Sequence, residues 1–236
     1  MTRMSGILLF LCLSIQAFGG GIVVQKVQGT VSVRQGVAEE WTGVKAGDIL
    51  NPDATIRTEK RGSAELVAVQ QAGTHKSIRL PGEVMVDMSD IRELSQEELM
   101  LKLTMEKVRS SSYQWKNNEM RLPNTTVTHG ADRGSETLPE NDPQVGMFLL
   151  NGTRVLFDNG FYSTCALKTM EVFRRYPELG RKFEHRWLAA EALEKADLRG
   201  EALNEFVAIS RIEGLTKEQE VRTLTRVEEL RKAAGR

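Results

Sequence analysis

The first half of the chain alternates apolar and polar residues with a period of two, which is typical of half-buried β-strands. The block from Trp41 to Leu66 holds several short stretches of this kind. They are separated by turn signals at Gly47-Asp48, Asn51-Pro52-Asp53 and Lys60-Arg61-Gly62-Ser63. Residues 22–33 before the block are rich in β-branched side chains, and residues 78–88 after it alternate around the turn Pro81-Gly82. This pattern predicts an all-β sandwich or roll.

After residue 94 the apolar residues recur every three to four positions, which is typical of amphipathic helices. A capping box at Ser95–Glu98 opens the first helix. Leu101, Met105 and Val108 line one face, supported by Leu99 and Leu103, and we expect this helix to pack on the sheet or to lead out of it. Five further helices are expected in the second half of the chain. They are predicted at residues 147–160, 165–176, 183–196, 201–212 and from 216 onward.

The last of these helices has two clear signals. A capping box at Thr216–Gln219 marks its start. Val221, Leu224, Val227 and Leu230 recur at helical spacing along it.

Between the strand pattern and the later helices, residues 110–146 lose both periodicities, and Ser, Asn, Gly and Pro accumulate. The fold class is therefore mixed, with an all-β module and a helical module segregated along the chain. We expect a signal peptide at 1–19, a β-domain at 21–109, a flexible linker at 110–146 and a helical domain at 147–236. The linker is expected to let the two modules move independently, which would suit the bridging of two partners.

The N-terminus has the three parts of a secretory signal peptide. Arg3 precedes an apolar run from Ile7 to Phe18, and small residues follow at 19–21. Polar residues interrupt this run, and it is shorter than the roughly 20 apolar residues of a membrane span. We expect cleavage after Gly19 and a periplasmic or secreted protein. The alternative is an uncleaved segment that anchors the chain in the inner membrane.

Composition, charge and motifs argue against several classes of function for this protein. The 236 residues carry 32 basic and 32 acidic side chains, and this zero balance argues against a dedicated nucleic-acid binder. The sequence contains no nucleophile elbow, phosphate loop or dinucleotide fingerprint. His75, His129 and His185 have no ligand spacing among themselves or with a cysteine. We therefore expect no enzyme activity, no catalytic residue, no metal and no cofactor.

The cysteine content limits which disulfides can form. Once the signal peptide is removed, Cys165 is the single remaining cysteine, so no intramolecular disulfide can form. Cys165 stands in an apolar helical pattern, and we expect a buried small hydrophobe rather than a reactive thiol.

One cluster of basic residues is a candidate site for partner binding. It surrounds the turn after Pro177 and comprises Arg174, Arg175, Arg181, Lys182 and Arg186. One interpretation is an ordinary solvated turn between helices, because runs of charge are usually exposed. The other is a basic docking patch for an acidic partner segment or for an anionic envelope polymer.

The helical half contains a repeat. Ala166, Met170 and Phe173 recur as Ala202, Phe206 and Ile209, an offset of 36 residues. This offset is close to the period of about 34 residues in tetratricopeptide arrays. Residues 160–177 resemble the second helix of such a repeat, and residues 187–206 resemble the helix pair of the next one. A generic helical bundle, which uses the same spacings, is the alternative.

The β-half resembles the FecR family domain over residues 21–109. The resemblance rests on an ordered set of pieces: GTVSV at Gly29–Val33, Trp41, KAGDIL at Lys45–Leu50, IRTEKRGSAEL at Ile56–Leu66 and IRLPGEV at Ile78–Val84. FecR proteins relay the state of an outer-membrane transporter to an extracytoplasmic sigma factor, through a cytoplasmic N-terminal segment and a membrane span. Only about twenty residues precede the β-domain here, and they have the pattern of a signal peptide. What the resemblance implies for this chain is therefore the fold and the envelope location.

These observations predict a non-enzymatic, exported adaptor of the bacterial cell envelope, in which both modules are interaction surfaces for proteins. The alternative is a membrane-anchored periplasmic regulator that signals to an extracytoplasmic sigma factor. The N-terminus separates the two, because a chain that starts at Gly20 leaves no part of the protein in the cytoplasm. Contact with a membrane is expected only if that segment is retained.

Overall fold

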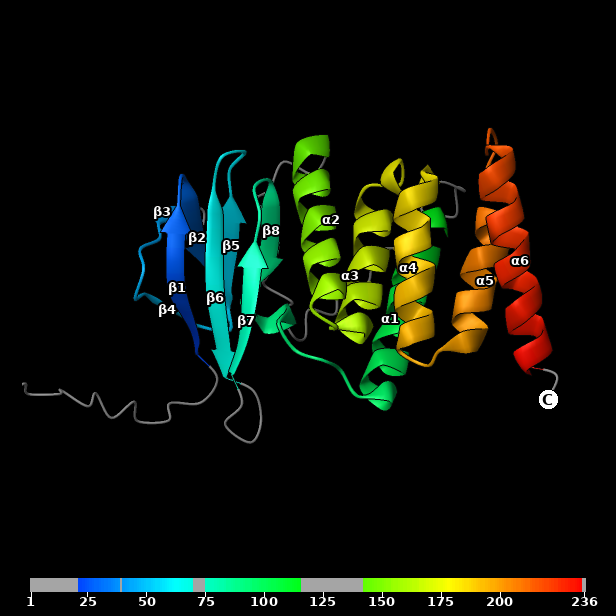
Figure 1. Ribbon diagram of the computed structural model, residues 1–236, viewed down its shortest axis with the longest axis horizontal. Coiled ribbons are helices and arrows are strands. Elements are labelled where there is room, and N and C mark those ends of the chain that lie inside the picture. The colour runs from blue at the N-terminus through cyan, green and yellow to red at the C-terminus, as the bar shows by residue number, and fades with distance from the viewer. Residues whose placement is uncertain (1–20, 39, 70–74, 116–141, 235–236) are drawn as a thin grey trace, which may run out of the picture.

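The computed structural model describes residues 21–38, 40–69, 75–115 and 142–234. Figure 1 shows two sheets in the N-terminal half of these residues, followed by a stack of helices. The mixed layout with an all-β part and a helical part is therefore confirmed. The predicted signal peptide lies outside the described residues, as does most of the predicted linker.

Two antiparallel sheets face each other across the first core. The first sheet has the order β4-β1-β6-β7, and the second has the order β3-β2-β5-β8. The strands of the first sheet are β1 (Ile22–Gln28), β4 (Ile49–Leu50), β6 (Ser63–Val69) and β7 (His75–Leu80). Those of the second are β2 (Val31–Gln35), β3 (Thr42–Gly43), β5 (Ala54–Thr58) and β8 (Val84–Asp87). Apolar residues of both inner faces, such as Val24, Ile56 and Leu66, are completely buried between the sheets.

The strand predicted over residues 22–33 is two strands, one in each sheet. Gly29 separates β1 from β2 with a φ of +64°. A Cβ atom at this position would lie 2.2 Å from the carbonyl oxygen of Arg61. Because glycine alone accepts both this conformation and this close approach, the chain can cross here from one sheet to the other.

The helices begin and end close to their predicted positions. They are α1 (Gln96–Trp115), α2 (Pro143–Asp158), α3 (Tyr162–Arg175), α4 (Phe183–Lys195), α5 (Arg199–Ile209) and α6 (Lys217–Ala234), with short 3₁₀ turns η2 (Met88–Asp90) and η3 (Leu179–Arg181). From α2 onward each helix packs against the next, and α1 packs against α3. The capping box at Thr216 is confirmed, since the Thr216 hydroxyl accepts from the Gln219 amide at 3.2 Å and the Gln219 side chain accepts from the Thr216 amide at 3.0 Å.

The apolar residues of α1 and of α6 do not share one buried face. On α1, Leu101, Met105 and Val108 are 63%, 48% and 65% exposed, whereas Leu99 and Leu103 are buried. The helix leads out of the β-half, and its main contacts are with α3 rather than with a sheet. On α6, Val227 and Leu230 are buried, but Val221 and Leu224 are exposed. In both helices apolar residues occupy opposite sides, so the spacing alone did not identify the side that packs.

The expectation that the two halves move independently is also wrong. Apolar side chains of the strands and of the helices form one continuous core. In addition, α1 continues to Trp115 and α2 begins at Pro143, so residues 110–115 and 143–146 of the predicted linker are helical. The β-half and the helical half are therefore packed against each other.

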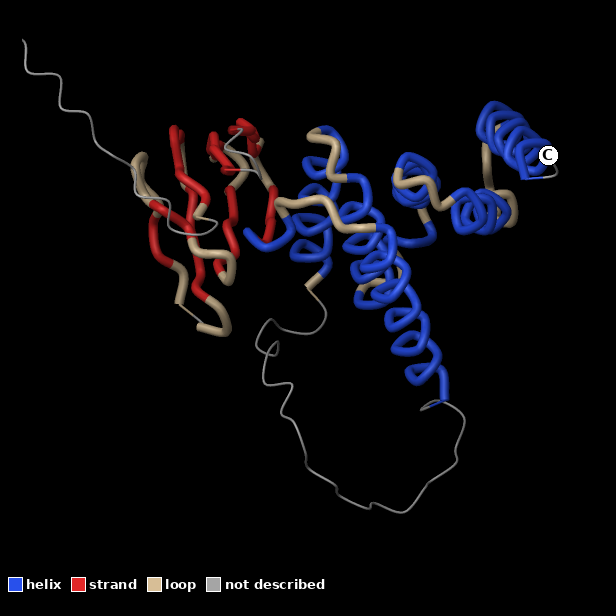
Figure 2. Tube along the Cα trace, turned by 90° about the horizontal axis from the view of Figure 1, so that it is seen from below, coloured by secondary structure: helices blue, strands red, loops and turns tan. Residues whose placement is uncertain are grey.

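Helix α2 makes the junction. The edge strands β7 and β8 lie on the same side of the two sheets, and α2 packs against both of them. The approach to β8 is very close, because a Cβ atom on Gly152 would lie 2.1 Å from the carbonyl oxygen of Met85. The side chain of Asn151 donates to the carbonyl oxygen of Glu83 at 2.8 Å. Figure 2, viewed from below, shows the two layers of strands ending at this helix.

The close approach at Gly152 gives a first prediction. Gly152→Ala should force α2 away from β8 and lower the free energy of unfolding by about 1–3 kcal/mol, as overpacking does. Urea denaturation followed by circular dichroism measures this loss. The matched control is Gly200→Ala, because a Cβ atom on this exposed glycine of α5 would meet nothing within 4 Å. A Gly152→Ala protein as stable as the wild type would contradict the close packing of α2 on β8.

Candidate functional site

The structure divides the predicted basic patch into two kinds of residue. Arg174 and Arg186 are half-buried and point at carboxylates within the protein. Arg175, Arg181 and Lys182 are exposed. The five residues are therefore not one free basic surface, and the binding of a partner at the three exposed residues stays a prediction.

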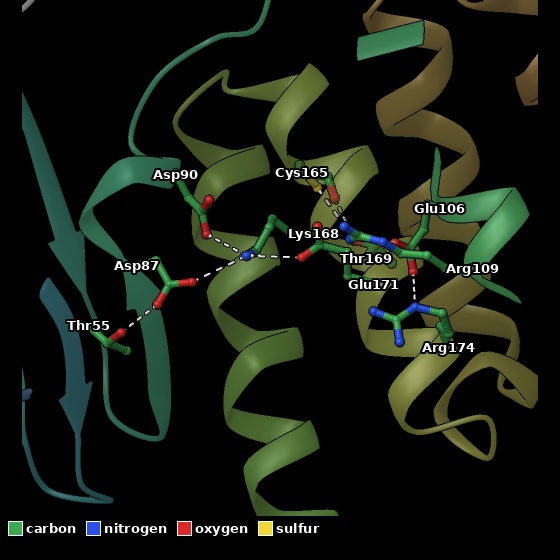
Figure 3. A network of polar contacts seen from close by, with 10 residues as sticks. All are labelled: Thr55, Asp87, Asp90, Glu106, Arg109, Cys165, Lys168, Thr169, Glu171 and Arg174. Carbon is green, nitrogen blue, oxygen red and sulfur yellow. Dashed lines mark hydrogen bonds and ion pairs between the residues drawn. The ribbon is translucent and has the colours of Figure 1, made fainter. Parts of the chain in front are cut away.

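The two internal arginines connect helices. Arg174 of α3 forms an ion pair with Glu106 of α1, whose side chain is almost fully buried (Figure 3). Arg186 of α4 donates to Glu205 of α5 at 2.7 Å and to the Gly180 carbonyl oxygen at 2.6 Å. Burial raises the pKa of the Glu205 carboxyl, and the Arg186 guanidinium opposes this rise. Both arginines thus neutralise buried acids that would otherwise destabilise the fold.

A second polar cluster joins the sheets to the helices, and Figure 3 shows it from close by. Lys168 of α3 lies 3.2 Å from Asp87 of β8, 3.2 Å from Asp90 of η2 and 3.1 Å from Glu171 of its own helix. Thr55 of β5 donates to Asp87 at 2.6 Å. We call these five residues the Lys168 cluster. It fixes α3 to the end of the second sheet.

The charges in the Lys168 cluster are unequal, since three carboxylates surround one ammonium group. Burial is the largest influence on the pKa of Asp90 and raises it from 3.8 to about 6, with Lys168 opposing the rise. The pKa of Asp87 is lowered, because Lys168 and the Thr55 hydroxyl outweigh its burial. The pKa of Lys168 is raised by its carboxylate neighbours, so it keeps its proton at neutral pH. This arrangement is a structural tie rather than an acid–base pair open to a substrate.

The cysteine and histidine positions offer no ligand set. Cys165 is fully buried, so the predicted burial is confirmed, and burial raises the pKa of its thiol to about 12. His185 is half-buried, and its Nδ1 lies 2.8 Å from the Leu179 carbonyl oxygen. His129 lies outside the described residues. In the described ranges no group of three or more His, Cys, Asp or Glu side chains is arranged to hold a metal ion.

The most distinctive hollow lies between α4 and α6. Both helices pack on α5, which separates them on one side (Figure 2). The space left between them has a volume of about 520 Å³. We call it the α4–α6 groove, and its lining residues are Trp187, Glu191, Glu194, Lys195, Arg222, Thr225 and Arg226. A wider hollow of about 810 Å³ at the start of α1 is lined mainly by exposed polar residues such as Gln96 and Arg199.

Side chains of α4 and α6 contact each other across the α4–α6 groove. Glutamates on α4 form hydrogen bonds or ion pairs with residues about one turn apart on α6, so α4 supplies the acidic wall and α6 the basic wall. Arg226 forms two hydrogen bonds with Glu194, and Arg222 lies 3.8 Å from Glu191. Gln219 donates to Glu184 at 3.2 Å.

Trp187 forms the floor of the groove. The Arg222 guanidinium lies 3.8 Å from the centre of its indole ring, a cation–π geometry. The indole is buried, and its Nε1 hydrogen-bonds to no other described residue. A buried donor without a partner is rare in folded proteins and marks a place where a further acceptor fits.

Sequence reasoning missed this groove. The helical pattern gave no reason to single out Trp187, Arg222 or Arg226. The signal available in the sequence was the acidic run of α4 and the basic residues of α6. It could be recognised only after the two helices were known to lie beside each other.

No protein-family model matches this chain. Neither a curated protein nor a solved structure was found that is similar to it.

The internal role of Arg174 gives a second prediction. Arg174→Gln should lower the free energy of unfolding by about 1–3 kcal/mol, because it leaves the buried Glu106 carboxylate without its closest cation. Arg175→Gln removes the same charge from an exposed neighbour and should change stability by less than about 0.5 kcal/mol. Urea denaturation of the two variants side by side measures the difference. Equal stability of both variants would contradict an internal role for Arg174.

Asp90 gives a third prediction, on pH. The folded protein holds the Asp90 proton up to about pH 6, whereas the unfolded chain releases it near 3.8, so this carboxyl costs stability as the pH rises through that window. Asp90→Asn mimics the protonated acid. It should match the wild type near pH 4 and exceed its free energy of unfolding by about 1–3 kcal/mol at pH 7.5. Asp53→Asn, at an exposed turn, is the control for the loss of a carboxylate, and an Asp90→Asn effect independent of pH would refute the assignment.

Proposed function

We propose that this protein is a non-enzymatic adaptor of the cell envelope that holds a peptide segment of a partner protein in the α4–α6 groove. The observation that carries the proposal is the groove itself. It combines a volume of about 520 Å³ with a buried indole donor that lacks a partner. Aromatic and arginine side chains in a concave surface are the residue types that dominate protein recognition.

The chemistry of the groove fits a peptide. The Nε1–H of Trp187 is buried and has no partner among the described residues, so it could donate to a backbone carbonyl oxygen of a peptide once the side chains that cover it move aside. Arg222 and Arg226 are held by glutamates of the opposite wall, so an acidic side chain of the partner could take the place of Glu191 or Glu194. The ion pairs between α4 and α6 thereby hold the groove in shape when no partner is bound.

The resemblances seen in the sequence support the same assignment. The pieces that resemble the FecR domain fall on strands β2, β4, β5, β6, β7 and β8 and on the turns beside them. The residues that repeat with an offset of 36 lie on α3 and α5, which are alternate helices of the stack. A tetratricopeptide-like stack would present such a groove to its ligand.

Export to the periplasm is part of the proposal and rests on the N-terminal signal pattern. Within the described ranges no helix has both the length and the apolar character needed to cross a bilayer.

The continuous core between sheets and helices means that two partners bound to the two halves would be held in a fixed relation rather than on a flexible tether.

A fourth prediction tests the groove. A photo-crosslinking amino acid at Thr225, an exposed residue of the groove, should trap one envelope protein in living cells. Thr225→Trp should fill the groove and abolish co-purification of that protein, since it blocks the space without touching the core. Asn204, exposed on α5, is the control position for both changes. Equal trapping from Thr225 and Asn204, or no effect of Thr225→Trp, would overturn the proposal.

A further inference from the structure

A second set of unusual contacts lies on the outer face of the sheet β3-β2-β5-β8. Val31, Val33 and Ile56 point into the core, so the residues between them point outward. The register pairs Ser32 with Arg57 and Arg34 with Thr55 across β2 and β5. Arg34 and Arg57 are therefore neighbours along the diagonal of one sheet face.

Trp41 lies between these two arginines. It directly precedes β3, whose Thr42 pairs with Val33 of β2, and this places Trp41 beside Arg34. The guanidinium carbons of Arg34 and Arg57 lie 5.2 Å and 4.5 Å from the centre of the Trp41 ring. The indole thus holds both cations close together, which their mutual repulsion would otherwise oppose.

Three polar side-chain atoms of this face have no hydrogen-bond partner. Ser32 Oγ, Arg34 Nε and Arg57 Nε are buried, and none of them hydrogen-bonds to another described residue. The remaining buried side-chain atom of this kind in the described ranges is Trp187 Nε1 of the α4–α6 groove. Buried polar atoms are almost always paired in folded proteins, so three unpaired atoms on adjacent positions of one sheet are unusual. A small movement of the two arginine side chains would bring these atoms within reach of an external acceptor.

The two arginines differ in their carboxylate partners. Arg57 forms an ion pair with Glu59 at 3.0 Å, but no carboxylate of the described residues lies within ion-pair distance of Arg34. Asp87, on the same row, is attracted by Arg34 and is held by Lys168 and Thr55. An incoming anion would therefore compete with Glu59 for Arg57, whereas Arg34 has no ion-pair partner to displace.

We infer that Arg34, Trp41 and Arg57 form a binding site for an extended acidic peptide of a partner protein, with carboxylates at alternate positions. Guanidinium groups recognise carboxylates through two parallel hydrogen bonds, and this geometry is specific as well as strong. Alternate side chains of an extended chain lie about 6–7 Å apart on one side, which is close to the diagonal spacing of neighbouring strands. Two successive carboxylates can thus reach the two arginines together.

The position of the site in the fold leaves room for such a peptide. β3 forms the edge of its sheet on the side away from the helices, whereas β8 lies beside α2 (Figure 1). Gly43 stands next to Ser32 across β3 and β2, and a Cβ atom there would meet nothing within 4 Å. The surface beside the arginines is therefore open rather than filled by a neighbouring side chain.

Fluorescence anisotropy with a labelled peptide of alternating glutamate and threonine tests the site at about 150 mM salt, where the Debye length is about 8 Å. The full chain should bind this peptide saturably, and a peptide with glutamine in place of glutamate should not bind. Arg34→Gln and Arg57→Gln should each weaken binding about tenfold or more, as the loss of a charged hydrogen bond does. Arg79→Gln, at an exposed position of β7 in the other sheet, is the matched control and should leave the affinity unchanged.

Three outcomes would overturn the inference. Absence of binding by the folded protein would do so, as would equal weakening by Arg79→Gln, which would indicate non-specific attraction of charge. Tighter binding of inorganic phosphate or of a polyuronate than of the peptide would assign the site to another anion. Circular dichroism melts of each arginine variant confirm that a loss of binding is not a loss of fold. Because the α4–α6 groove is untouched by these changes, failure here would leave the proposed function standing.

Discussion

The covering of two open sheet edges by one helix is the constraint on which the rest of this structure depends. Exposed edge strands pair readily with other chains, and β7 and β8 are both edges on the same side of the sandwich. Helix α2 covers them, and it can do so because Gly152 lets its backbone approach Met85 without a side chain between them. The first core thereby continues into the helical stack, and Lys168 of the next helix can reach Asp87 and Asp90.

Around this junction, acidic and basic residues form ion pairs within the protein. Three carboxylates about Lys168 are costly to bury, and the cost is visible in the raised pKa of Asp90. Arg174 and Arg186 hold buried carboxylates in the same way between neighbouring helices. Buried ion pairs contribute less to stability than to the choice of one arrangement among several, and here they fix the relative positions of sheet and helices.

Among the described residues, buried polar side-chain atoms without a hydrogen-bond partner occur in two places, which lie at opposite ends of the described structure. One is at Trp187 in the α4–α6 groove, and the other is the outer sheet face around Trp41. Each combines an indole ring with arginine. A rigid body with two such surfaces suits a protein that holds its partners in a defined geometry, as we propose.

The sequence by itself determined the local elements, because strand and helix periods, caps and turns depend on residues near one another along the chain. It predicted a β-sandwich followed by helices, the capping box at Thr216 and the burial of Cys165. It could not show that Gly29 sends β1 and β2 to different sheets, or which of two apolar sides of α1 is buried, because both depend on distant segments. Likewise, the pairing of Arg174 with Glu106, the α4–α6 groove and the meeting of Arg34 with Trp41 and Arg57 arise only where separate elements pack together. Tertiary structure decided these sites, because a contact between residues far apart in sequence produces no periodic pattern along the chain.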